Sequence, residues 1–469
     1  MGSTLGLCRT IGPQPPTLGR IVQGGLLLIA LCATSACQTY RPAPPSLLAY
    51  PNAVDARTLD DRPSGALWTT ADLITAAVSR NPQIAEAAAK YRTAVAAAKT
   101  AKVAPAATLT LTAEYSKDAG GSSPWLYGAS SDIPLDYGVR RSGRLGQADL
   151  AVIQARYDYA ETVWAVRQAL VRTLSDRAAA DADTPITAAL VQDRQARAVA
   201  MDRRVAAGED QRSVALTAQI ELAAAQRRER DTGARRAQAD IALAKALGVS
   251  AAQVKSLKIA APQTPPSTAV TGQMRHQAAL TRRDVLKAVN DYDLAELALR
   301  GEIAKQYPEL RIGPGYTWER GVRKLPFNLT LGLPPYDLNR AAIAQAEAKR
   351  AEAGSSLEAV QAGVLAAVDQ AQAVLAAAQD AEATIRARDL RLAQRQSQDQ
   401  ALSRRMGETD SLDQRAAHAA ALDSELAAHD AAHAVRMAVA DLEDALRLPF
   451  DPPEVRPLQI ALKRLGGGS

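Results

Sequence analysis

Aromatic residues are scarce in this sequence. They make up 4% of its 469 residues, with only two Phe and four Trp. Large globular cores obtain much of their buried area from such side chains, so the sequence argues against one large globular core. Alanine recurs throughout instead, which favours long helices packed at close range, because each alanine buries little surface.

The cysteines are few and lie near the N-terminus, at Cys8, Cys32 and Cys37. Basic residues and a short apolar run, 24–31, precede Cys37, and this pattern is typical of an export signal that is too brief to span a bilayer. The small residues before Cys37 resemble a bacterial lipobox. The resemblance implies that residues 1–36 are a lipoprotein signal peptide and that Cys37 is the lipidation site, whereas an ordinary signal peptide cut nearby is the alternative. After cleavage at Cys37 the mature chain would have no disulfide.

The sequence also lacks long apolar runs and clusters of one charge after this signal. Its 56 basic and 50 acidic residues are interleaved along the chain. Interleaved charges indicate a solvated helical surface and argue against a nucleic-acid-binding stripe, which needs basic residues gathered with aromatics. No later segment reaches the length of about 18 apolar residues that a transmembrane helix needs, so we expect none.

Motifs for enzyme chemistry are missing too. There is no glycine-rich nucleotide loop, no P-loop and no Ser-His-Asp arrangement. His429 and His433 stand at positions i and i+4, as on a zinc-binding helix, but Asp430 occupies the place where a metalloprotease has Glu. Surface or structural histidines, a weak metal contact and a zinc-dependent hydrolase are the open interpretations. We expect no enzyme and no cofactor.

Two copies of one unit make up most of the chain. Each copy has a proline before an alternating segment, then an apolar-Pro segment ending in Asp, and later a segment with glycine followed by glutamate. These landmarks recur about 200 residues apart, at Pro105 and Pro308, at 133–136 and 333–337, and at 203–209 and 404–408.

The repeats set the expected domain boundaries. An acylated N-terminus and a Pro-rich tether cover 37–67. The first repeat covers 68–248 and the second 273–448, with a linker at 249–272 between them and a C-terminal tail at 449–469. Each repeat is predicted to run helix, two strands, very long helix, tight turn and shorter helix.

Four strands are expected, two in each repeat. Alternating apolar and polar residues place them at about 106–117, 123–135, 309–319 and 325–334. Aromatic residues gather in these segments, and alternation over about ten residues with aromatic ends is what a membrane β-barrel strand needs. A soluble β-hairpin inserted between helices shows the same pattern strand by strand and is the alternative.

Each repeat also predicts one very long helix. The stretches from Asp136 to Gly208 and from Asp337 to Gly407 would form rods of roughly 105 Å, each matching two shorter helices placed end to end. The first rod carries two apolar seams with steps of three and four residues, the period of knobs-into-holes packing. We therefore expect it to have neighbours on two sides, as a stave in a cylinder does, and to be kinked or interrupted at Pro185.

The strand count bears on the assembly. Four strands cannot close into a barrel, and open sheet edges are not tolerated in lipid. Three chains would supply twelve strands, an even number within the range of known barrels, together with twelve helical staves. Closure therefore predicts a homotrimer, although counting by itself leaves two or four chains open.

The order and spacing of these landmarks resemble the TolC family of outer-membrane factors. The likeness covers about 68–448 and includes Asn81-Pro82, Pro105 and Pro308. It implies a mainly α fold with a small β part, in which a long coiled-coil helical barrel continues four strands per chain of a 12-stranded trimeric membrane β-barrel. It also implies a lipid-anchored location in the outer membrane, in contact with its lipid and extending into the periplasm. The implied partners are a periplasmic adaptor protein and an inner-membrane pump, with no nucleic acid.

In this family the two glycine turns form a periplasmic tip at which adaptors dock. Carried over, the tip positions are Val205, Gly208, Glu209, Met406, Gly407 and Glu408. The resemblance also places Asp413 at an acidic ring, as a possible gate that favours cations, and an exposed surface aspartate is the alternative. Without the family, glycine simply takes the backbone angles of a tight reversal or a helix cap.

A narrower likeness lies in the second repeat. Segments 283–285, 306–310, 313–317 and 337–340 look like the cobalt–zinc–cadmium efflux branch, which works with resistance–nodulation–division pumps. The implied function is a passive export duct for divalent heavy-metal cations in a tripartite efflux system. Multidrug efflux or type I protein secretion through the same architecture, and a periplasmic coiled-coil scaffold without a barrel, are the alternatives.

Overall fold

The computed structural model describes residues 40–59, 65–117, 123–262 and 270–465, so the expected signal peptide and Cys37 lie outside it. The chain divides into two units, Met1–Ala53 and Val54–Ser469. In the first unit the described residues have no regular element until helix α2, Ala49–Ala56, which crosses the boundary. This helix lies in the segment where the sequence indicates an extended tether.

The first repeat, with the start of the linker, contains three strands and five helices. Its elements are β1 (Leu67–Trp68), α3 (Thr70–Arg80), α4 (Pro82–Ala101), β2 (Thr108–Tyr115), β3 (Trp125–Pro134), α5 (Gly138–Ala206), α6 (Arg212–Leu247) and α7 (Ala251–Lys255). The first helix of the pattern is divided in two, because Asn81 takes up an extended conformation and its side chain accepts hydrogen bonds from the N–H groups of Gln83 and Ile84. Pro82 then begins α4 at a position whose N–H would have no partner.

The second repeat has the same order. Its elements are β4 (Lys258–Ile259), α8 (Gly272–Thr281), α9 (Arg283–Ala304), β5 (Glu309–Glu319), β6 (Val322–Lys324), β7 (Phe327–Gly332), α10 (Arg340–Thr384), the π-helix η1 (Ile385–Leu390), α11 (Arg391–Arg405), α12 (Ser411–Leu446) and α13 (Pro452–Arg464). The last helix lies in the expected C-terminal tail and packs on α3 and α5.

Helix α5 continues through Pro185, so the interruption expected there does not occur. The Thr184 and Thr187 hydroxyls donate to the carbonyls of Ala180 and Asp183 at 2.7 and 3.0 Å, which adds hydrogen bonds in the helical turns around the proline. Packing of the buried Ile186 and Thr187 against neighbouring helices holds this stretch in place. Tertiary contacts therefore outweigh the local cost of the proline.

One helical stretch bears on the expectation that no later segment is apolar enough to span a membrane. Arg340–Arg405 includes an 18-residue window of mean hydropathy 1.3, which is long and apolar enough to cross a membrane by length and composition. Alanine supplies most apolar positions in α10, so a window can reach this value without large side chains. This stretch packs on α9 and α12, as expected for a long wall helix, and one such window is weak evidence for a span.

Strands β2, β3, β5, β6 and β7 form one antiparallel sheet in the order β2, β3, β5, followed by β6 and β7, which both pair with β5. Strands β1 and β4 form a separate two-stranded parallel sheet. The fourth expected strand, at about 325–334, corresponds to β7. A further short strand, β6, precedes it, and Pro326, which has no N–H to donate, lies between the two. On one side of this proline, Val322–Lys324 pairs with 317–319, and on the other Phe327–Gly332 pairs with 309–314. The β part is thus a four-position sheet whose last position holds β6 and β7.

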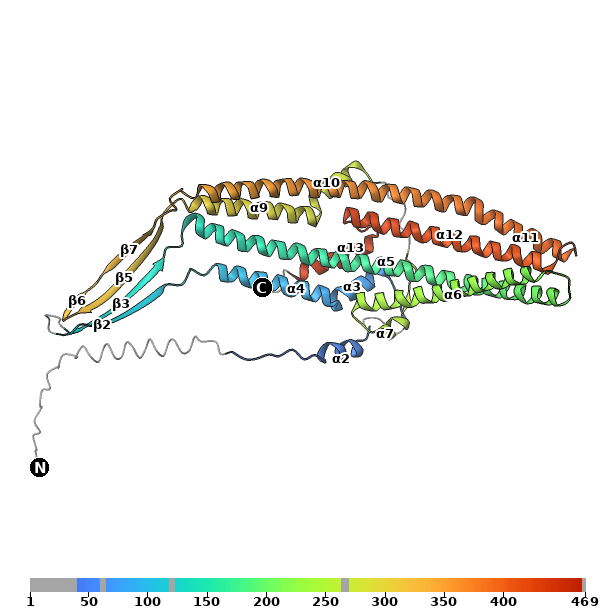
Figure 1. The fold of residues 1–469 in the computed structure, drawn as a ribbon, viewed down its shortest axis with the longest axis horizontal. Coiled ribbons are helices and arrows are strands. Elements are labelled where there is room, and N and C mark those ends of the chain that lie inside the picture. Colours follow the sequence, from blue (N-terminus) through green and yellow to red (C-terminus); the bar gives the residue numbers. More distant parts are fainter. Residues whose placement is uncertain (1–39, 60–64, 118–122, 263–269, 466–469) are drawn as a thin grey trace, which may run out of the picture. The chain divides into compact units, whose positions relative to one another are not determined.

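The helices follow the same order as the strands. Helix α4 leads into β2, β3 leads into α5, α9 leads into β5, and β7 leads into α10. Helix α5 lies between α4 and α9, and α9 contacts α10 (Figure 1). The two apolar seams of α5 are thereby explained, and the expectation of neighbours on two sides is confirmed.

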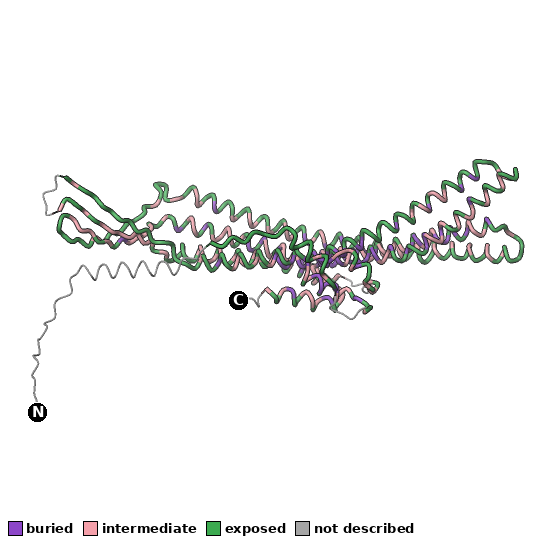
Figure 2. The backbone as a smooth tube through the Cα atoms, turned by 90° about the horizontal axis from the view of Figure 1, so that it is seen from below, coloured by how far each residue is buried: buried purple, intermediate pink, exposed green. Residues whose placement is uncertain are grey.

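Buried side chains gather where short and long helices of both repeats meet (Figure 2). One core cluster contains Leu73, Leu170 and Leu243, from α3, α5 and α6. A second contains Val368 and Leu442, from α10 and α12. The strands are mostly exposed or half-buried, so the sheet has no core of its own among the described residues.

Candidate functional site

The sheet has one apolar face and one polar face. Successive strand residues point to opposite faces, and the register places Leu111 opposite Ala129, which in turn lies opposite Tyr316. The apolar face carries Leu109, Leu111, Tyr115, Trp125, Tyr127, Ile133, Leu310, Ile312, Tyr316, Trp318, Phe327, Leu329 and Leu331, together with Ser131 and, opposite Trp318, Arg323 of β6. The polar face carries Thr108, Thr110, Thr112, Ser130, Asp132, Arg311, Thr317, Asn328 and Thr330.

The large side chains of the apolar face are exposed. Leu111 and Phe327 are 73% and 67% exposed. On the polar face, by contrast, Arg311 Nη2 lies 2.8 Å from Asp132 Oδ2, an ion pair across β3 and β5. An apolar face of this size needs a nonpolar environment, while its reverse side is suited to water.

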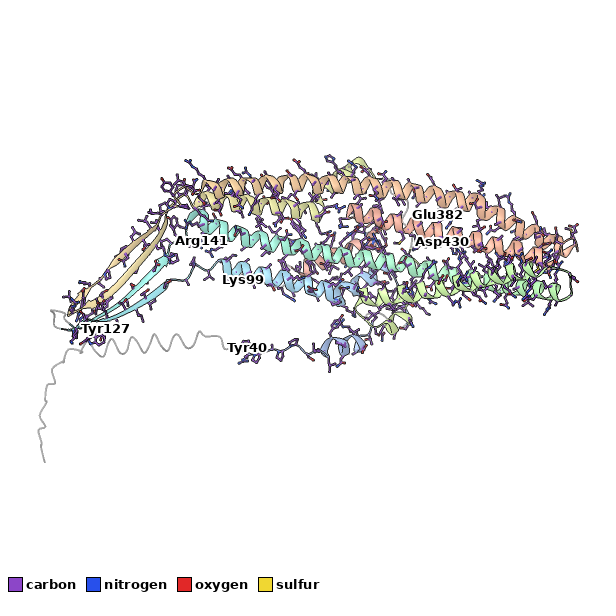
Figure 3. The ribbon with its side chains drawn as sticks, in the orientation of Figure 1. Tyr40, Lys99, Tyr127, Arg141, Glu382 and Asp430 are labelled. Carbon is purple, nitrogen blue, oxygen red and sulfur yellow. The ribbon has the colours of Figure 1, made fainter. Side chains whose placement is uncertain are left out.

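Aromatic side chains form a band at the end of the sheet away from the helices, where Figure 3 labels Tyr127. The ring centroids of Tyr115 and Trp125 lie 5.0 Å apart, and those of Trp125 and Tyr127 lie 5.6 Å apart. Trp318 continues the band across the next strand. From Leu310 to Trp318 the apolar face spans roughly 26 Å at the rise of an extended strand, close to the apolar band of membrane barrels.

Both outer strands of the sheet are open on one side. In the part of the chain that the structure describes, β2 pairs only with β3, and β7 pairs only with β5. All residues of both strands are exposed. These edges leave backbone N–H and C=O groups available for pairing with further strands.

At the opposite end of the helices, the first glycine turn ends α5. Gly208 has a φ of 77°, a left-handed conformation that side-chain-bearing residues rarely adopt. The N–H of Glu209 donates to the carbonyl of Arg204 at 2.9 Å, and that of Gly208 donates to the carbonyl of Val205 at 3.0 Å. This pair of bonds is the Schellman motif, which closes a helix and reverses the chain.

The second glycine turn has the same geometry at the end of α11. Gly407 has a φ of 78°. The N–H of Glu408 donates to the carbonyl of Ser403 at 2.9 Å, and that of Gly407 to the carbonyl of Arg404 at 3.1 Å. The two repeats therefore end their long helices in equivalent turns.

The side chains expected at the tip lie at these turns. Met406 is 65% exposed, Glu209 and Glu408 are exposed, and Val205 is half-buried. The turns thus present apolar and acidic groups side by side, which suits a protein partner more than a small ligand.

One arginine links the two turns. The Arg204 Nε lies 2.7 Å from Asp210 Oδ2 in its own turn, and its Nη1 lies 3.4 Å from Asp410 Oδ2 in the other. Because these three side chains are part-exposed, we expect each ion pair to contribute less than about 1 kcal/mol. Their arrangement ties the tips of the two repeats together.

Comparison with known proteins identifies this architecture. Residues 73–249 match the sequence profile of the family described as outer membrane efflux protein. Members of that family are passive channels and not enzymes. No curated protein sequence matches the chain.

Solved structures match most of the chain. The outer-membrane channel OprN superposes with a TM-score of 0.69 at 18% identity, over 89% of this chain and 99% of that one. The outer membrane protein VceC from Vibrio cholerae gives 0.65 at 16%, over 81% and 97%. The MtrE channel of Neisseria gonorrhoeae, solved in its open state, gives 0.64 at 16%, over 81% and 89%. This chain has the TolC-like channel fold. The mainly α fold class with a small β part is therefore confirmed.

The TolC-like fold gives His429 and His433 separate partners. The Nδ1 of His429 lies 3.1 Å from Asp183 Oδ1, and the Nε2 of His433 lies 2.9 Å from Asp176 Oδ1, both across the α5–α12 interface. No group of three or more His, Cys, Asp and Glu side chains able to hold a metal ion occurs among the described residues. The helical spacing that suggested a metal contact instead serves two hydrogen bonds between helices.

These histidines belong to a polar interface that sequence reasoning missed. Side chains of α5 and α12 pair along much of its length. The pairs are Trp164–Asp444, Arg172–Asp441, Asp176–His433, Asp183–His429, Asp193–Arg415 and Arg194–Asp423. Their polar character in both helices was visible in the sequence, but their pairing was not.

A buried charged cluster was also missed. Arg167 lies in an apolar seam of α5 and is 2% exposed. Its Nη1 lies 2.6 Å from Glu443 Oε2, and its Nε donates to Glu454 Oε2 at 2.8 Å. Burial raises the pKa of Glu454, against the opposing effect of Arg167. The only sequence signal was the arginine that interrupts the seam.

Asp413 lies in the first turn of α12 and is exposed. No ion pair to its carboxylate is found within the described ranges. An acidic side chain in this position also stabilises the helix N-terminus, so its placement fits both a structural role and a gate.

Proposed function

We propose that this protein is the outer-membrane channel of a tripartite efflux system, a passive duct across the periplasm and the outer membrane. The observation that best supports this function is that the sheet has one apolar face, which is exposed, and one polar face. Lipid on that side and water on the other satisfy both faces, whereas water on both would leave an aggregation-prone surface. The helices that continue each strand supply the periplasmic part of the wall.

A homotrimer closes the duct. The free edges are β2 on one side and β6 with β7 on the other, and antiparallel pairing of one chain's β2 with β6 and β7 of the next would close these edges. Helices α4 and α10 are continuous with these strands, so the same step brings them together as neighbouring staves. Sheet closure and helix closure are thus one event.

The tip turns are the proposed contact with a periplasmic adaptor protein, and through it with an inner-membrane pump of the resistance–nodulation–division type. Val205, three residues before Gly208, and Met406, directly before Gly407, supply apolar contact. Glu209 and Glu408, each directly after a turn glycine, supply charge. Two equivalent docking turns in each chain would give six in a trimer. Gly208 and Gly407 set the turn geometry on which this surface depends.

Asp413 is the proposed gate residue. It follows the second tip turn, and three copies around a narrow axis would favour cations. The variant Asp413→Asn should lower the cation-to-anion permeability ratio in a planar bilayer. Equal selectivity of the variant and the native channel would remove Asp413 from the gate and leave the duct intact.

The proposed location is the outer membrane, with residues 1–36 removed and Cys37 acylated. A lipid on Cys37 would add an anchor to the barrel, since a single acyl chain gives only reversible membrane binding. Mass spectrometry of the mature N-terminus tests this directly. A free N-terminus at another residue would leave the barrel as the membrane attachment.

Divalent heavy-metal cations are the proposed cargo. The support is the likeness of 283–285, 306–310, 313–317 and 337–340 to the cobalt–zinc–cadmium branch. Deletion of the gene should increase growth inhibition by zinc, cobalt and cadmium, and the intact gene should restore growth. If the deletion strain is sensitive to dyes and lipophilic antibiotics instead, the cargo is drugs and the metal assignment is wrong. If the strain fails to export a protein, the channel serves type I secretion.

The duct itself is tested by conductance. Purified trimers should insert into planar bilayers and conduct ions. A periplasmic scaffold without a barrel would fractionate away from the outer membrane and conduct nothing, which would overturn the proposed function.

A further inference from the structure

A hollow of about 400 Å³ lies where the sheet meets the helices. The β3–α5 junction and the α9–β5 junction form its walls. Its lining includes Leu135, Tyr137, Val139, Ile303, Tyr307 and Leu310. Tyr137 and Tyr307 are 54% and 68% exposed, so the hollow combines apolar walls with amphipathic aromatic side chains at its rim.

The hollow lies at the end of the apolar face of the sheet, to which Leu135 and Leu310 of its lining belong, whereas Glu309 belongs to the polar face. The N–H of Leu135 donates to the carbonyl of Leu310 at 3.0 Å, which continues the register in which Ile133 lies opposite Ile312. Leu135 and Leu310 are therefore the last apolar pair before the helices. The aromatic band of Tyr127 and Trp318 lies at the other end of the same face.

Its position in the strand order keeps the hollow away from the free edges. It lies between β3 and β5 and between α5 and α9, the two inner positions of each layer. Chains that join through β2 and β7 would meet at the outer positions. The hollow therefore stays open to the surrounding lipid in a closed assembly.

Basic side chains surround it. The two wall segments, 135–144 and 300–310, contain five basic and three acidic residues. Arg140 Nη1 is paired with Glu309 Oε2 at 2.8 Å. Arg300 Nε lies 3.3 Å from Glu296 Oε1. Arg350 Nη1 lies 3.1 Å from Oε2 of the same carboxylate.

Arg141 adds a further cation at the start of α5, where Figure 3 labels it. It follows Arg140, which lines the hollow, by one residue at the start of α5. Arg141 is exposed, and no ion pair to it occurs in the described part of the chain. Arg141 thus leaves positive charge near the hollow without a carboxylate partner among the described residues, and Arg300 shares the carboxylate of Glu296 with Arg350.

We propose that this hollow is a binding site for an anionic glycerophospholipid. An acyl chain lies along Leu135 and Leu310, and the headgroup phosphate meets Arg141 and Arg300, with the two tyrosines at the boundary between them. Arginine matches phosphate geometry, and tyrosine is typical of the membrane interface. The site rests on the proposed function, because it requires the apolar face to lie in lipid.

The test uses the full-length assembly, delipidated in detergent and titrated with phosphatidylglycerol or phosphatidylcholine, with bound lipid counted by native mass spectrometry. The native assembly should retain phosphatidylglycerol preferentially. The double variant Arg141→Gln/Arg300→Gln should weaken that binding about tenfold or more, because two charge-assisted contacts are lost, and should leave phosphatidylcholine binding unchanged. The matched control Arg227→Gln/Arg230→Gln removes the same charge from exposed positions of α6 and should bind as the native assembly does.

Three outcomes would overturn the site. These are equal retention of both lipids by the native assembly, unchanged phosphatidylglycerol binding in the double variant, and displacement of the lipid by an equal amount of inorganic phosphate. Planar-bilayer conductance of the same preparations separates the two proposals. Conducting channels without lipid preference would remove the lipid site alone, whereas failure to insert would remove the proposed function.

Discussion

The Nε of Arg167 on α5 donates to the Oε2 of Glu454 on α13 at 2.8 Å, across 287 residues of sequence. Glu443 of α12 completes the cluster on the other side of the guanidinium. One buried cation thus serves two buried carboxylates. Because the cluster joins three helices, it holds together parts of the chain that the repeat pattern treats as independent.

Replacing Arg167 with Met should destabilise the helical part by about 3–5 kcal/mol, because two buried carboxylates would lose their counter-charge. Thermal unfolding followed by circular dichroism checks this. The control Arg172→Met removes an exposed pair with Asp441 and should cost less than about 1 kcal/mol. Equal losses of stability in the two variants would mean that the buried cluster contributes no more than an exposed ion pair.

The stability should depend on pH through Glu454. Burial raises the pKa of Glu454 above its ordinary value of 4.5, so the folded protein binds this proton more tightly than the unfolded chain. Its contribution to stability is therefore fully present below pH 4.5 and is lost as the pH rises through the folded pKa. Glu454→Gln should gain stability relative to the native protein between acid and neutral pH, as measured by denaturant unfolding. A native advantage that grows with pH would contradict this sign.

The two faces of the sheet predict opposite responses to charge. Leu111→Arg puts a cation on the apolar face and should disfavour membrane insertion by about 2–4 kcal/mol. Thr110→Arg, on the neighbouring residue of the same strand, puts it on the polar face and should insert normally. Liposome flotation measures both variants. Similar insertion of the two would reverse the assignment of the apolar face to lipid.

The tip glycines should not tolerate a side chain. Gly208→Ala or Gly407→Ala places a Cβ on a left-handed backbone, at a local cost of about 1–2 kcal/mol. Amide hydrogen exchange should accelerate at the altered turn. Gly233→Ala, inside α6 with nothing within 4 Å of the added carbon, is the control and should be stabilising. Unchanged exchange at the turns would show that the strain is relieved elsewhere.

Zinc should not recognise His429 and His433 as a pair. Each imidazole already faces its own carboxylate, so zinc should shift the thermal midpoint of the native protein and of His429→Gln/His433→Gln equally. A zinc-dependent shift confined to the native protein would restore the metal interpretation of the helical spacing.

Features with a local period were accessible to sequence reasoning. The stretch between Asp136 and Gly208 contains α5, and the alternation at 309–319 coincides with β5. Helix and strand periods repeat within a few residues, so the pattern carries them without knowledge of partners. Pro82 also lies where the first helix divides, although the predicted order has a single helix before the first two strands.

Features that depend on partners were not accessible. The π-helix η1 interrupts the long helix of the second repeat at 385–390 without a proline or glycine to mark it. The partner of His429, Asp183, lies 246 residues away, and the sequence around either residue does not indicate the pairing. The disruption of helix α5 by Pro185 was overestimated for the same reason, because packing around Ile186 and Thr187 decides whether the helix continues.

The sequence by itself determined the two repeats, the element types, the alternation that makes two-faced strands and the glycine turns, because each depends on neighbours a few residues apart. Only the tertiary structure decided the strand order, the open edges, the pairing of Arg167 with two glutamates and the hollow beside Leu135 and Leu310. Those features arise from contacts between segments that are far apart in the sequence. The interaction energy of such contacts depends on both segments, so neither segment carries a periodic pattern that predicts it.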